Sequence, residues 1–453
     1  MNLISKLAWL TSWSVVSSSS CPFKVAEHHD YEALTSQLVC LNKTYTENAY
    51  LYSIGQSSQS REMWVLSISK SKPAEILPGR AEIKYVANMH GNEVVGRELL
   101  LKLVTDMLEN PTNPEYVNLL QNTRIHFMPS MNPDGYELAK TKPKDYLLGR
   151  SNANDVDLNR NFPNLDELIC LGEAIDYENI MNDALPDKEI QPETKNVINW
   201  LYNNNFVLSA NLHGGDLVAN YPFDSSCDKN PFTGQYVQEY NGSPDDGLFR
   251  FLAKSYADNH PNMSNSEKYA CDRQSDLPAF NNGITNGAMW YSVPGGMQDF
   301  NYLAANTFEI TLELGCDKFP DSNKLPDYWA SNKKSLTTFL SNVFCAVTGS
   351  VFIGYEDYNI KVPNAKIQVD GDDNSMGMDL PVDEFGRYWR ILTPGEHQVR
   401  AVLENGDSSS WYFINISDNC RESGKPVELD LIIEPSAYDF SPSQQLLQIL
   451  SKN

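Results

Sequence analysis

Basic charge is in short supply in this chain. Its 35 Lys and Arg are outnumbered by 59 Asp and Glu, and the net charge is −24. Nucleic-acid binding requires a basic face, so a nucleic-acid partner is not expected. An acidic surface suits cationic partners such as basic peptides. Net charge bears on association rather than on fold, so it supports basic peptides as partners and says nothing about the fold.

Long hydrophobic runs are also scarce. Beyond the N-terminus no apolar run reaches the roughly 20 residues of a membrane-spanning helix. The tail at 437–453 is polar and lacks the hydrophobic segment of a lipid-anchor signal. Residues 1–20 combine one Lys, an apolar run at 7–16 and small residues before Cys21, which is typical of a secretory signal peptide. We therefore expect a monomer, secreted or in the secretory-pathway lumen, without a transmembrane segment or lipid anchor.

Cysteines are present, but none forms a Cys-x-x-C pair, which argues against a zinc ribbon. In a secreted chain the eight cysteines predict disulfides. Sequence alone leaves 105 pairings open for eight cysteines. N-glycosylation in the same compartment is possible at four sequons, which are Asn42, Asn241, Asn262 and Asn415.

Two short segments supply metal-binding side chains. His90 and Glu93 lie in His-Gly-Asn-Glu, and His213 lies 120 residues beyond Glu93 in Asn-Leu-His-Gly-Gly. Two imidazoles and one carboxylate leave the fourth position of a tetrahedral zinc ion open, which distinguishes a catalytic site from a closed structural one. An isolated His-x-x-E also arises by chance, so the surrounding sequence is needed to judge whether these residues bind a metal.

The surroundings place these residues at strand ends. The segments 81–89, 124–129, 206–212 and 307–314 have strand composition, and helical periodicity covers 93–109, 191–204 and 246–258. His90 and Glu93 then occupy a strand-to-helix turn, and His213 the carboxyl end of a strand. Open α/β sheets place their sites at that edge. The sequence therefore points to a zinc hydrolase.

Further motifs follow in a fixed order. They are Asn-Pro-Asp-Gly-Tyr at 132–136, Gly-Arg at 149–150, Asp-Leu-Asn-Arg-Asn-Phe-Pro at 157–163, Tyr-Pro-Phe-Asp at 221–224, Trp-Tyr-Ser-Val-Pro-Gly-Gly-Met-Gln-Asp-Phe at 290–300 and Phe-Glu-Ile-Thr-Leu-Glu-Leu at 308–314. From about Tyr31 to about Pro435 the chain resembles the zinc metallocarboxypeptidases of the regulatory subfamily that includes carboxypeptidases D, E, M and N.

The resemblance implies one zinc ion per chain, held by His90, Glu93 and His213. It makes Glu313 the general base, a carboxylate that takes a proton from water and passes it to the leaving amine. Glu309 lies four residues earlier on the same strand face. Spacing does not choose between the two, and the motif Glu-Leu-Gly-Cys selects Glu313. Glu309 is expected to be a solvated strand residue.

The same resemblance assigns substrate contacts. Asn159 and Arg160 would hold the terminal carboxylate, since a guanidinium suits that planar anion. Arg150 would lie near the scissile carbonyl, where a fixed cation stabilises developing charge. Tyr291 would close over the bound residue. Asp224, with Gln298, would form a pocket for a terminal Lys or Arg, although composition alone favours a turn residue at Asp224.

Two regions are expected. Residues 24–345 would form an α/β catalytic domain, a mixed central sheet flanked by helices. Residues 346–436 have short strands separated by Pro, Gly and Asp, which predicts a small β-sandwich that resembles the subfamily's transthyretin-like domain. By similarity the best single disulfide is Cys271 with Cys316, and Cys227 is an alternative partner for Cys271.

Some features depart from the family pattern or lie outside it. Asp155 stands where relatives commonly carry Gly or another small or polar residue, and Thr307 stands where a Cys is frequent. The remaining histidines have no partner motif and are expected to be structural or solvated; they are His28, His29, His126, His260 and His397.

Three functions are compatible with these motifs. The first is a secreted zinc exopeptidase that removes C-terminal Lys or Arg from peptides or proteins. The second is a catalytically silent relative that binds partners, which loss of Glu313, Arg160 or a zinc ligand would have indicated. The third is a zinc deacylase of small amides, which needs neither Tyr291 nor Asp224. The complete motif set favours the first.

Overall fold

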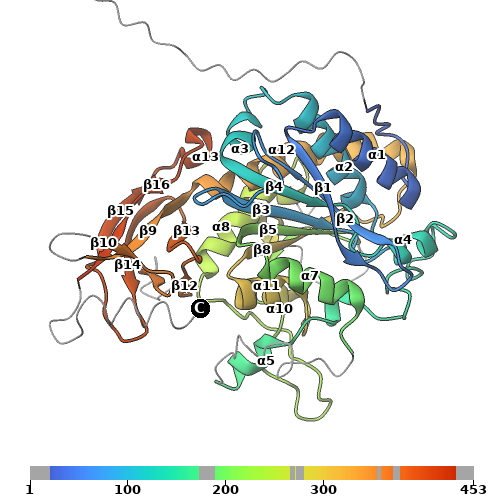
Figure 1. The fold of residues 1–453 in the computed structure, drawn as a ribbon. Coiled ribbons are helices and arrows are strands. Elements are labelled where there is room, and N and C mark those ends of the chain that lie inside the picture. Colours follow the sequence, from blue (N-terminus) through green and yellow to red (C-terminus); the bar gives the residue numbers. More distant parts are fainter. Residues whose placement is uncertain are drawn as a thin grey trace, which may run out of the picture.

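A computed structural model describes residues 21–172, 189–265, 271, 280–354, 359–370 and 378–434. The expected signal peptide at 1–20 and the tail at 437–453 lie outside the described residues. A mixed sheet lies between two layers of helices, and an all-β region follows it (Figure 1). The expected fold class, α/β followed by all-β, is confirmed.

The large sheet has the order β1-β2-β4-β3-β5-β8-β6-β7. Its strands are β1 (Ala49–Gln56), β2 (Glu62–Ile68), β3 (Ala81–Ala87), β4 (Thr123–Met128), β5 (Phe206–His213), β6 (Leu217–Tyr221), β7 (Ile284–Asn286) and β8 (Phe308–Leu314). The four central strands β4, β3, β5 and β8 run parallel. They coincide with the four predicted strands to within two residues, the usual uncertainty of strand ends. Their carboxyl ends meet at one edge of the sheet.

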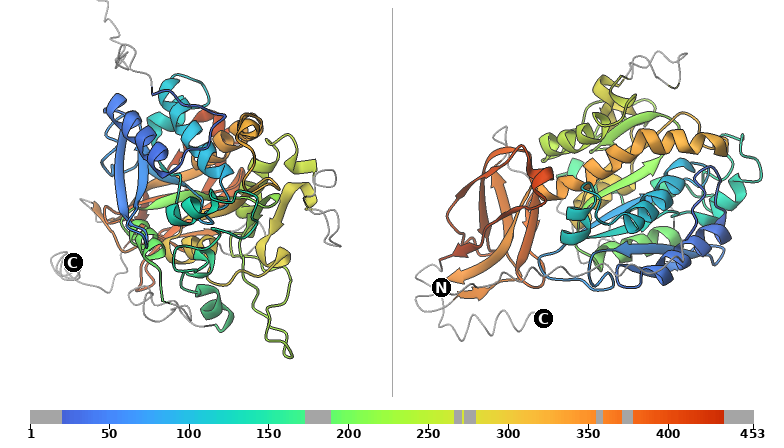
Figure 2. Two further views of the ribbon diagram at one scale, coloured as in Figure 1. Left: turned by 90° about the vertical axis from the view of Figure 1, so that its right-hand side faces the viewer. Right: turned by 90° about the horizontal axis from the view of Figure 1, so that it is seen from above.

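Helices cover both faces of this sheet. One face carries α1 (Tyr31–Thr44), α2 (Val95–Glu109), α8 (Asp246–Ala257) and α12 (Leu325–Ser341), seen from above in Figure 2, and the other carries α7 (Pro192–Tyr202) and α11 (Met297–Ala305). The shorter helices are α3 (Val117–Asn122), α4 (Pro133–Ala139), α5 (Leu165–Cys170), α10 (Gly287–Trp290) and α13 (Cys420–Ser423). Short 3₁₀ turns are η1 (Leu158–Arg160), η2 (Met263–Asn265), η3 (Asn281–Gly283), η4 (Ser322–Lys324) and η5 (Asn342–Phe344). The predicted helices correspond to α2, α7 and α8.

The C-terminal region has a hydrophobic core of its own, with Val351, Ile367 and Val399 fully buried in it. Its strands are β9 (Ala346–Gly354), β10 (Asn359–Lys361), β11 (Lys366–Asp370), β12 (Leu380–Pro381), β13 (Arg387–Ile391), β14 (Gly395–Val402), β15 (Tyr412–Ile416), β16 (Val427–Glu428) and β17 (Leu431–Ile433). β9 is central to one sheet, and β12-β11-β14-β15 form the other. Alternating burial along β14 is typical of a strand with one face on a core.

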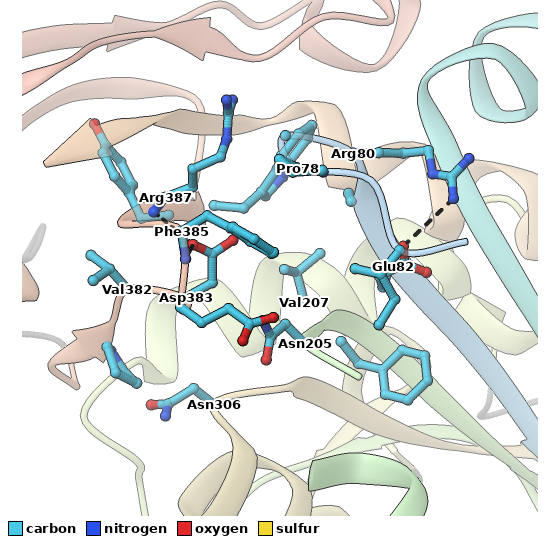
Figure 3. A pocket seen from close by; sticks show the side chains of 18 of the residues that line it. Pro78, Arg80, Glu82, Asn205, Val207, Asn306, Val382, Asp383, Phe385 and Arg387 are labelled. Carbon is cyan, nitrogen blue, oxygen red and sulfur yellow. Dashed lines mark hydrogen bonds and ion pairs between the residues drawn. The ribbon is translucent and has the colours of Figure 1, made fainter. Parts of the chain in front are cut away.

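Polar contacts join the two regions. Arg390 of β13 is 2% exposed and forms an ion pair with Asp245, next to α8. The Trp389 indole donates to the Val343 carbonyl at 2.9 Å. A cavity of about 500 Å³ also lies at this junction, at the amino ends of β3 and β5. Figure 3 shows Arg80 and Glu82 on one wall of it and Val382, Asp383, Phe385 and Arg387 on the opposite wall.

Four disulfides bridge the eight cysteines. The predicted pair Cys271–Cys316 is confirmed. The alternative pairing of Cys271 with Cys227 is wrong, because Cys227 bonds to Cys170. The other two pairs are Cys21–Cys40 and Cys345–Cys420, the latter within the C-terminal region.

Candidate metal centre and substrate cavity

The turn after β3 holds two of the predicted metal ligands. Asn88 has a positive φ of 59°, a conformation that Asn tolerates better than most residues. Its side-chain amide donates to the carbonyls of His90, Gly91 and Glu93 at 2.9–3.2 Å. A Cβ on Gly91 would lie 2.2 Å from the Gly135 backbone, so only glycine fits there. This turn fixes both ligands before α2 begins.

The third ligand comes from a neighbouring strand. His213 is the last residue of β5, and its register partner on β8 is Glu313. β5 also pairs with β3, where Ala87 lies opposite Leu212. Strand pairing therefore brings residues distant in sequence to one sheet edge, as predicted from the strand ends.

The three ligand side chains converge on one point. Nδ1 of His90 lies 3.1 Å from Nδ1 of His213 and 3.1 Å from Oε2 of Glu93. His213 Nδ1 lies 2.9 Å from the same Glu93 oxygen. All three residues are 3% exposed, and they form a candidate metal-binding group.

The tautomer of His90 fits a metal as well. Its Nε2 faces Asp157 Oδ1 at 3.0 Å, so the ring proton belongs on Nε2 and the lone pair on Nδ1 points at Glu93 and His213. Two nitrogens and one carboxylate oxygen form a donor set that zinc accepts. The residues present therefore fit a zinc ion.

Two nearby residues, Asp157 and Lys318, were not predicted to belong to the site. Asp157 orients His90 and also accepts from Arg150, whose Nε lies 3.1 Å from Asp157 Oδ2. Burial would raise the pKa of Asp157, but His90 and Arg150 hold it far below its usual range. Lys318 pairs with Glu93 Oε1 at 3.0 Å, through the oxygen turned away from the histidines. The sequence signal was their position inside or directly after the motifs at 157–163 and 308–316.

Glu313 lies beside this centre with little neutralisation. It is 7% exposed, and its Oε2 has no hydrogen-bond partner among the described residues. Burial raises the pKa of Glu313 well above its usual value, and the Glu93 carboxylate raises it further. A dication held by Glu93 would lower that pKa.

A cavity of about 590 Å³ opens beside the centre. Eight of the ten residues predicted for the site line it, namely His90, Glu93, Arg150, Asn159, His213, Asp224, Tyr291 and Glu313. Arg160 and Gln298 do not belong to its wall. Tyr291 is 43% exposed at the mouth, with its ring 4.7 Å from that of Trp290.

Arg150 and Asn159 line the cavity, and Arg160 is the next residue after Asn159. Nη1 of Arg150 reaches to 3.2 Å of His90 Nδ1 and 3.4 Å of Glu93 Oε1. Asn159 accepts from the Met297 amide at 3.0 Å through Oδ1, which leaves its Nδ2 as the end that can donate to a ligand. Arg160 donates to the Asn159 carbonyl at 2.8 Å. Asp155, in the loop between the arginines, has φ 60°, a conformation that the Gly common at this position in relatives adopts without strain.

Asp224 forms a distant part of the wall. It is 2% exposed and accepts from Asn220 Nδ2 at 2.9 Å. A Cβ on Gly287 would lie 1.9 Å from Asp224 Oδ1, so the carboxylate packs directly on that backbone. Burial raises the pKa of Asp224 to about 7. Gln298, 1% exposed, lies within hydrogen-bonding reach of this carboxyl.

The expectation that Glu309 is solvated is wrong. Glu309 is fully buried, and its Oε2 accepts from Lys84 Nζ at 2.9 Å and from the Ser209 hydroxyl. Lys84 and Ser209 are register partners, as are Ser209 and Glu309. The three polar side chains thus form one row across β3, β5 and β8 and neutralise one another inside the sheet.

The fold and the donor set define a metallohydrolase-type site at the carboxyl edge of a mixed α/β sheet. Residues 34–335 match the family model described as Zinc carboxypeptidase. The chain belongs to the zinc carboxypeptidase family, and membership implies a zinc ion at the His-Glu-His group.

Named relatives cover most of the chain. It is 41% identical over 429 residues to carboxypeptidase E of Caenorhabditis elegans, spanning 92% of this chain and 89% of that protein. It is 43% identical over 388 residues to the human carboxypeptidase N catalytic chain, spanning 84% and 81%. Human carboxypeptidase D is 42% identical over 86% of this chain, which spans only 26% of that longer protein.

Solved structures agree on the fold. Carboxypeptidase A from Helicoverpa armigera superposes with a TM-score of 0.52 at 16% identity, over 71% of this chain and 76% of that one. Thrombin activatable fibrinolysis inhibitor gives 0.52 at 17% identity, over 70% and 74%. In the part of the chain that the structure describes, no helix combines the length and apolar character needed to cross a membrane.

Proposed function

We propose that this chain is a zinc-dependent exopeptidase that releases C-terminal Lys or Arg from peptides or proteins. One observation carries the proposal: a single cavity is lined both by the metal-binding group and by the buried carboxyl of Asp224. A substrate that fills it presents a peptide bond to the first and its terminal side chain to the second.

His90, Glu93 and His213 hold the zinc ion. When bound, zinc supplies a Lewis acid that polarises a carbonyl and lowers the pKa of water. Glu313 then acts as general base, taking a proton from the attacking water and giving it to the departing amine. Its buried position and its Oε2, which has no donor among the described residues, suit that role. Arg150 supplies a fixed cation beside the developing oxyanion.

The free C-terminus is the second recognition element. Asn159 Nδ2 and the Arg160 guanidinium together provide donors for a carboxylate. Arg160 is not among the residues that line the cavity, so the proposal requires its side chain to turn toward the ligand. Tyr291, partly exposed at the mouth, closes over the bound residue. A requirement for a terminal carboxylate makes the enzyme an exopeptidase.

Asp224 sets the preference for basic residues. A buried carboxyl is costly unless a cation pairs with it, and a terminal Lys or Arg side chain provides that cation. Gln298, close to Asp224, contributes polar contacts to the same side chain. Relatives named carboxypeptidase E and carboxypeptidase N support the assignment.

We infer an extracellular or secretory-pathway location from the disulfides, because they persist in oxidising compartments. Cleavage of a signal peptide at 1–20 and glycosylation, for instance at the exposed Asn415, belong to the same proposal. The enzyme works as a monomer. The C-terminal β region, with the expected transthyretin-like boundaries 346–436, serves as a structural or partner-binding module.

A peptide panel tests the proposal. Peptides identical except for a terminal Arg, Lys, Leu or Phe, and an Arg peptide with an amidated C-terminus, are incubated with the full chain, and release is followed by mass spectrometry. We expect release from the free Arg and Lys peptides only, abolished by a zinc chelator. Release of Leu or Phe would contradict the Asp224 pocket. Zinc binding with no release would favour a silent binding protein, and hydrolysis of small acylated amides instead would favour a deacylase.

A further inference from the structure

Two more buried carboxyls lie behind Asp224. Asp299 of α11 is 1% exposed and Asp166 of α5 is 5% exposed. Asp299 Oδ2 accepts the backbone N–H of Asp224 at 2.6 Å and that of Ser225 at 3.3 Å. Asp299 therefore fixes the backbone that carries the Asp224 side chain, although it does not line the cavity itself.

Asp166 and Asp299 also contact each other. Their side chains lie within hydrogen-bonding reach. Each keeps one oxygen, Oδ1, that has no donor among the described residues. Two ionised carboxylates offer only acceptors, so the contact requires a proton on one of the two. The pair thus holds a proton in the interior, directly behind the pocket.

The charge around Asp224 is incompletely balanced. The charged and titratable groups that face it are Arg160, Glu309, Tyr291, Asp299 and Asp166. Lys84 already neutralises Glu309. Arg160 is then the single cation for three carboxyls among these groups, and the proposed substrate carboxylate also requires it. A cationic substrate side chain would supply the missing positive charge.

We propose that Asp299 and Asp166 are positioning residues that set how much negative charge the Asp224 pocket presents, so that cationic terminal residues bind more tightly as the pH rises through neutrality. The inference rests on the proposed function and deepens it. Burial raises the pKa of Asp224 and of Asp166 to about 7, and the pKa of Asp299 well above its usual value. As the pH falls below 7, protons occupy the cluster and the pocket loses its charge.

The test compares two substrates of equal shape. Peptides ending in Arg and in citrulline differ by the guanidinium charge, so the ratio of their KM values cancels pH effects on zinc and Glu313. For the zinc-loaded full chain we expect the preference for Arg over citrulline to weaken as the pH falls from 8.5 to 5.5. If one proton is linked to binding, the ratio of the KM values can change by at most roughly tenfold per pH unit. A preference for Arg that is flat with pH would overturn the inference and leave the proposed function standing.

Variants assign the effect to the pair. In Asp166→Asn one acid is lost, while the amide can still donate to Asp299. We expect the midpoint of the KM ratio to move down by about one pH unit because a like charge is removed, with kcat for the Arg peptide within twofold of the parent. Asp299→Asn keeps an oxygen for the Asp224 amide and should shift the midpoint the same way.

A purely structural role would appear differently. It would raise KM for both peptides equally at every pH, leave the midpoint in place and lower the melting temperature. An unshifted midpoint in both variants would contradict the proposal. If neither variant folds, the ratio measured on the parent enzyme still decides. If the parent enzyme shows no preference for Arg at any pH, it is the proposed Asp224 specificity that fails.

Discussion

One glutamate lies in the middle of β8 and another near its carboxyl end, and the two have different neighbours. Glu309 and Glu313 lie four residues apart on one strand, and both are buried. Lys84 and Ser209 bond to Glu309 and neutralise it. Each acid keeps one oxygen without a partner among the described residues, Oε1 of Glu309 and Oε2 of Glu313, but Glu313 faces another carboxylate, Glu93, where Glu309 has a bonded ammonium.

The difference teaches that neighbours, rather than residue type or burial, separate a structural acid from a reactive one. A carboxylate neutralised by a buried ammonium has little tendency to take a proton from water. A carboxylate near a metal site that has no such ion pair, as proposed for Glu313, can take a proton and give it back. Asp166 and Asp299, the acids behind Asp224, likewise differ from Glu309, because Lys84 forms an ion pair with Glu309.

The largest effect should follow from Glu313→Gln. Removing the base should lower kcat by roughly 10²–10⁴-fold, while zinc remains at one ion per chain because His90, Glu93 and His213 are intact. Arginine release and metal content, measured on one preparation, check both statements. Glu309→Gln, on the same strand, is the matched control and should retain kcat. Equal losses in the two variants would erase the distinction between these acids.

The next largest effect is the loss of stability expected when Glu309 loses its ion pair with Lys84. Lys84→Met leaves Glu309 buried without its cation and should lower the free energy of unfolding by about 3–5 kcal/mol. Denaturant unfolding measures the loss, and the double variant Lys84→Met/Glu309→Leu should recover most of it. A loss below about 0.5 kcal/mol, typical of a surface substitution, would show that the pair is not a structural unit.

A smaller effect is expected at the metal centre. Asp157→Asn removes the carboxylate that orients His90 and should weaken zinc affinity by roughly 10–100-fold. Competition with a chelator gives the affinity. Asp155→Asn, in the same loop at a residue that forms no hydrogen bond to His90 or His213 among the described residues, should leave the zinc affinity unchanged. Unaltered zinc affinity in Asp157→Asn would remove Asp157 from this role.

The smallest effect concerns the pH dependence of stability. Burial raises the pKa of Asp166 to about 7 in the folded chain, against about 3.9 for an unperturbed Asp. The folded state holds the extra proton between these values, so stability falls as the pH rises from about 4 to 7. Asp166→Asn lacks that loss, so its free energy of unfolding should fall less than that of the parent between pH 4 and pH 8. Urea unfolding at both pH values checks this, and an identical difference at both would contradict it.

Much of the architecture could be predicted because it follows local patterns. Periodicity located α2, α7 and α8, and strand composition located the four parallel strands. The metal-binding group was suggested by the two segments that carry His90, Glu93 and His213, was supported by the rule that sites lie at carboxyl strand ends, and was assigned by the family resemblance. What remained hidden depends on register between distant strands: Lys84 and Glu309 are 225 residues apart and meet through Ser209. Periodicity fixes which face a residue occupies but not the residue across from it, so a buried acid was expected to be solvated.

The most direct test of the account is a zinc titration of the metal-free full chain, with arginine release from a peptide ending in Arg as the readout. The account predicts no release without zinc and a linear rise that ends at one equivalent per chain. Binding of one equivalent without any release from that peptide would contradict it.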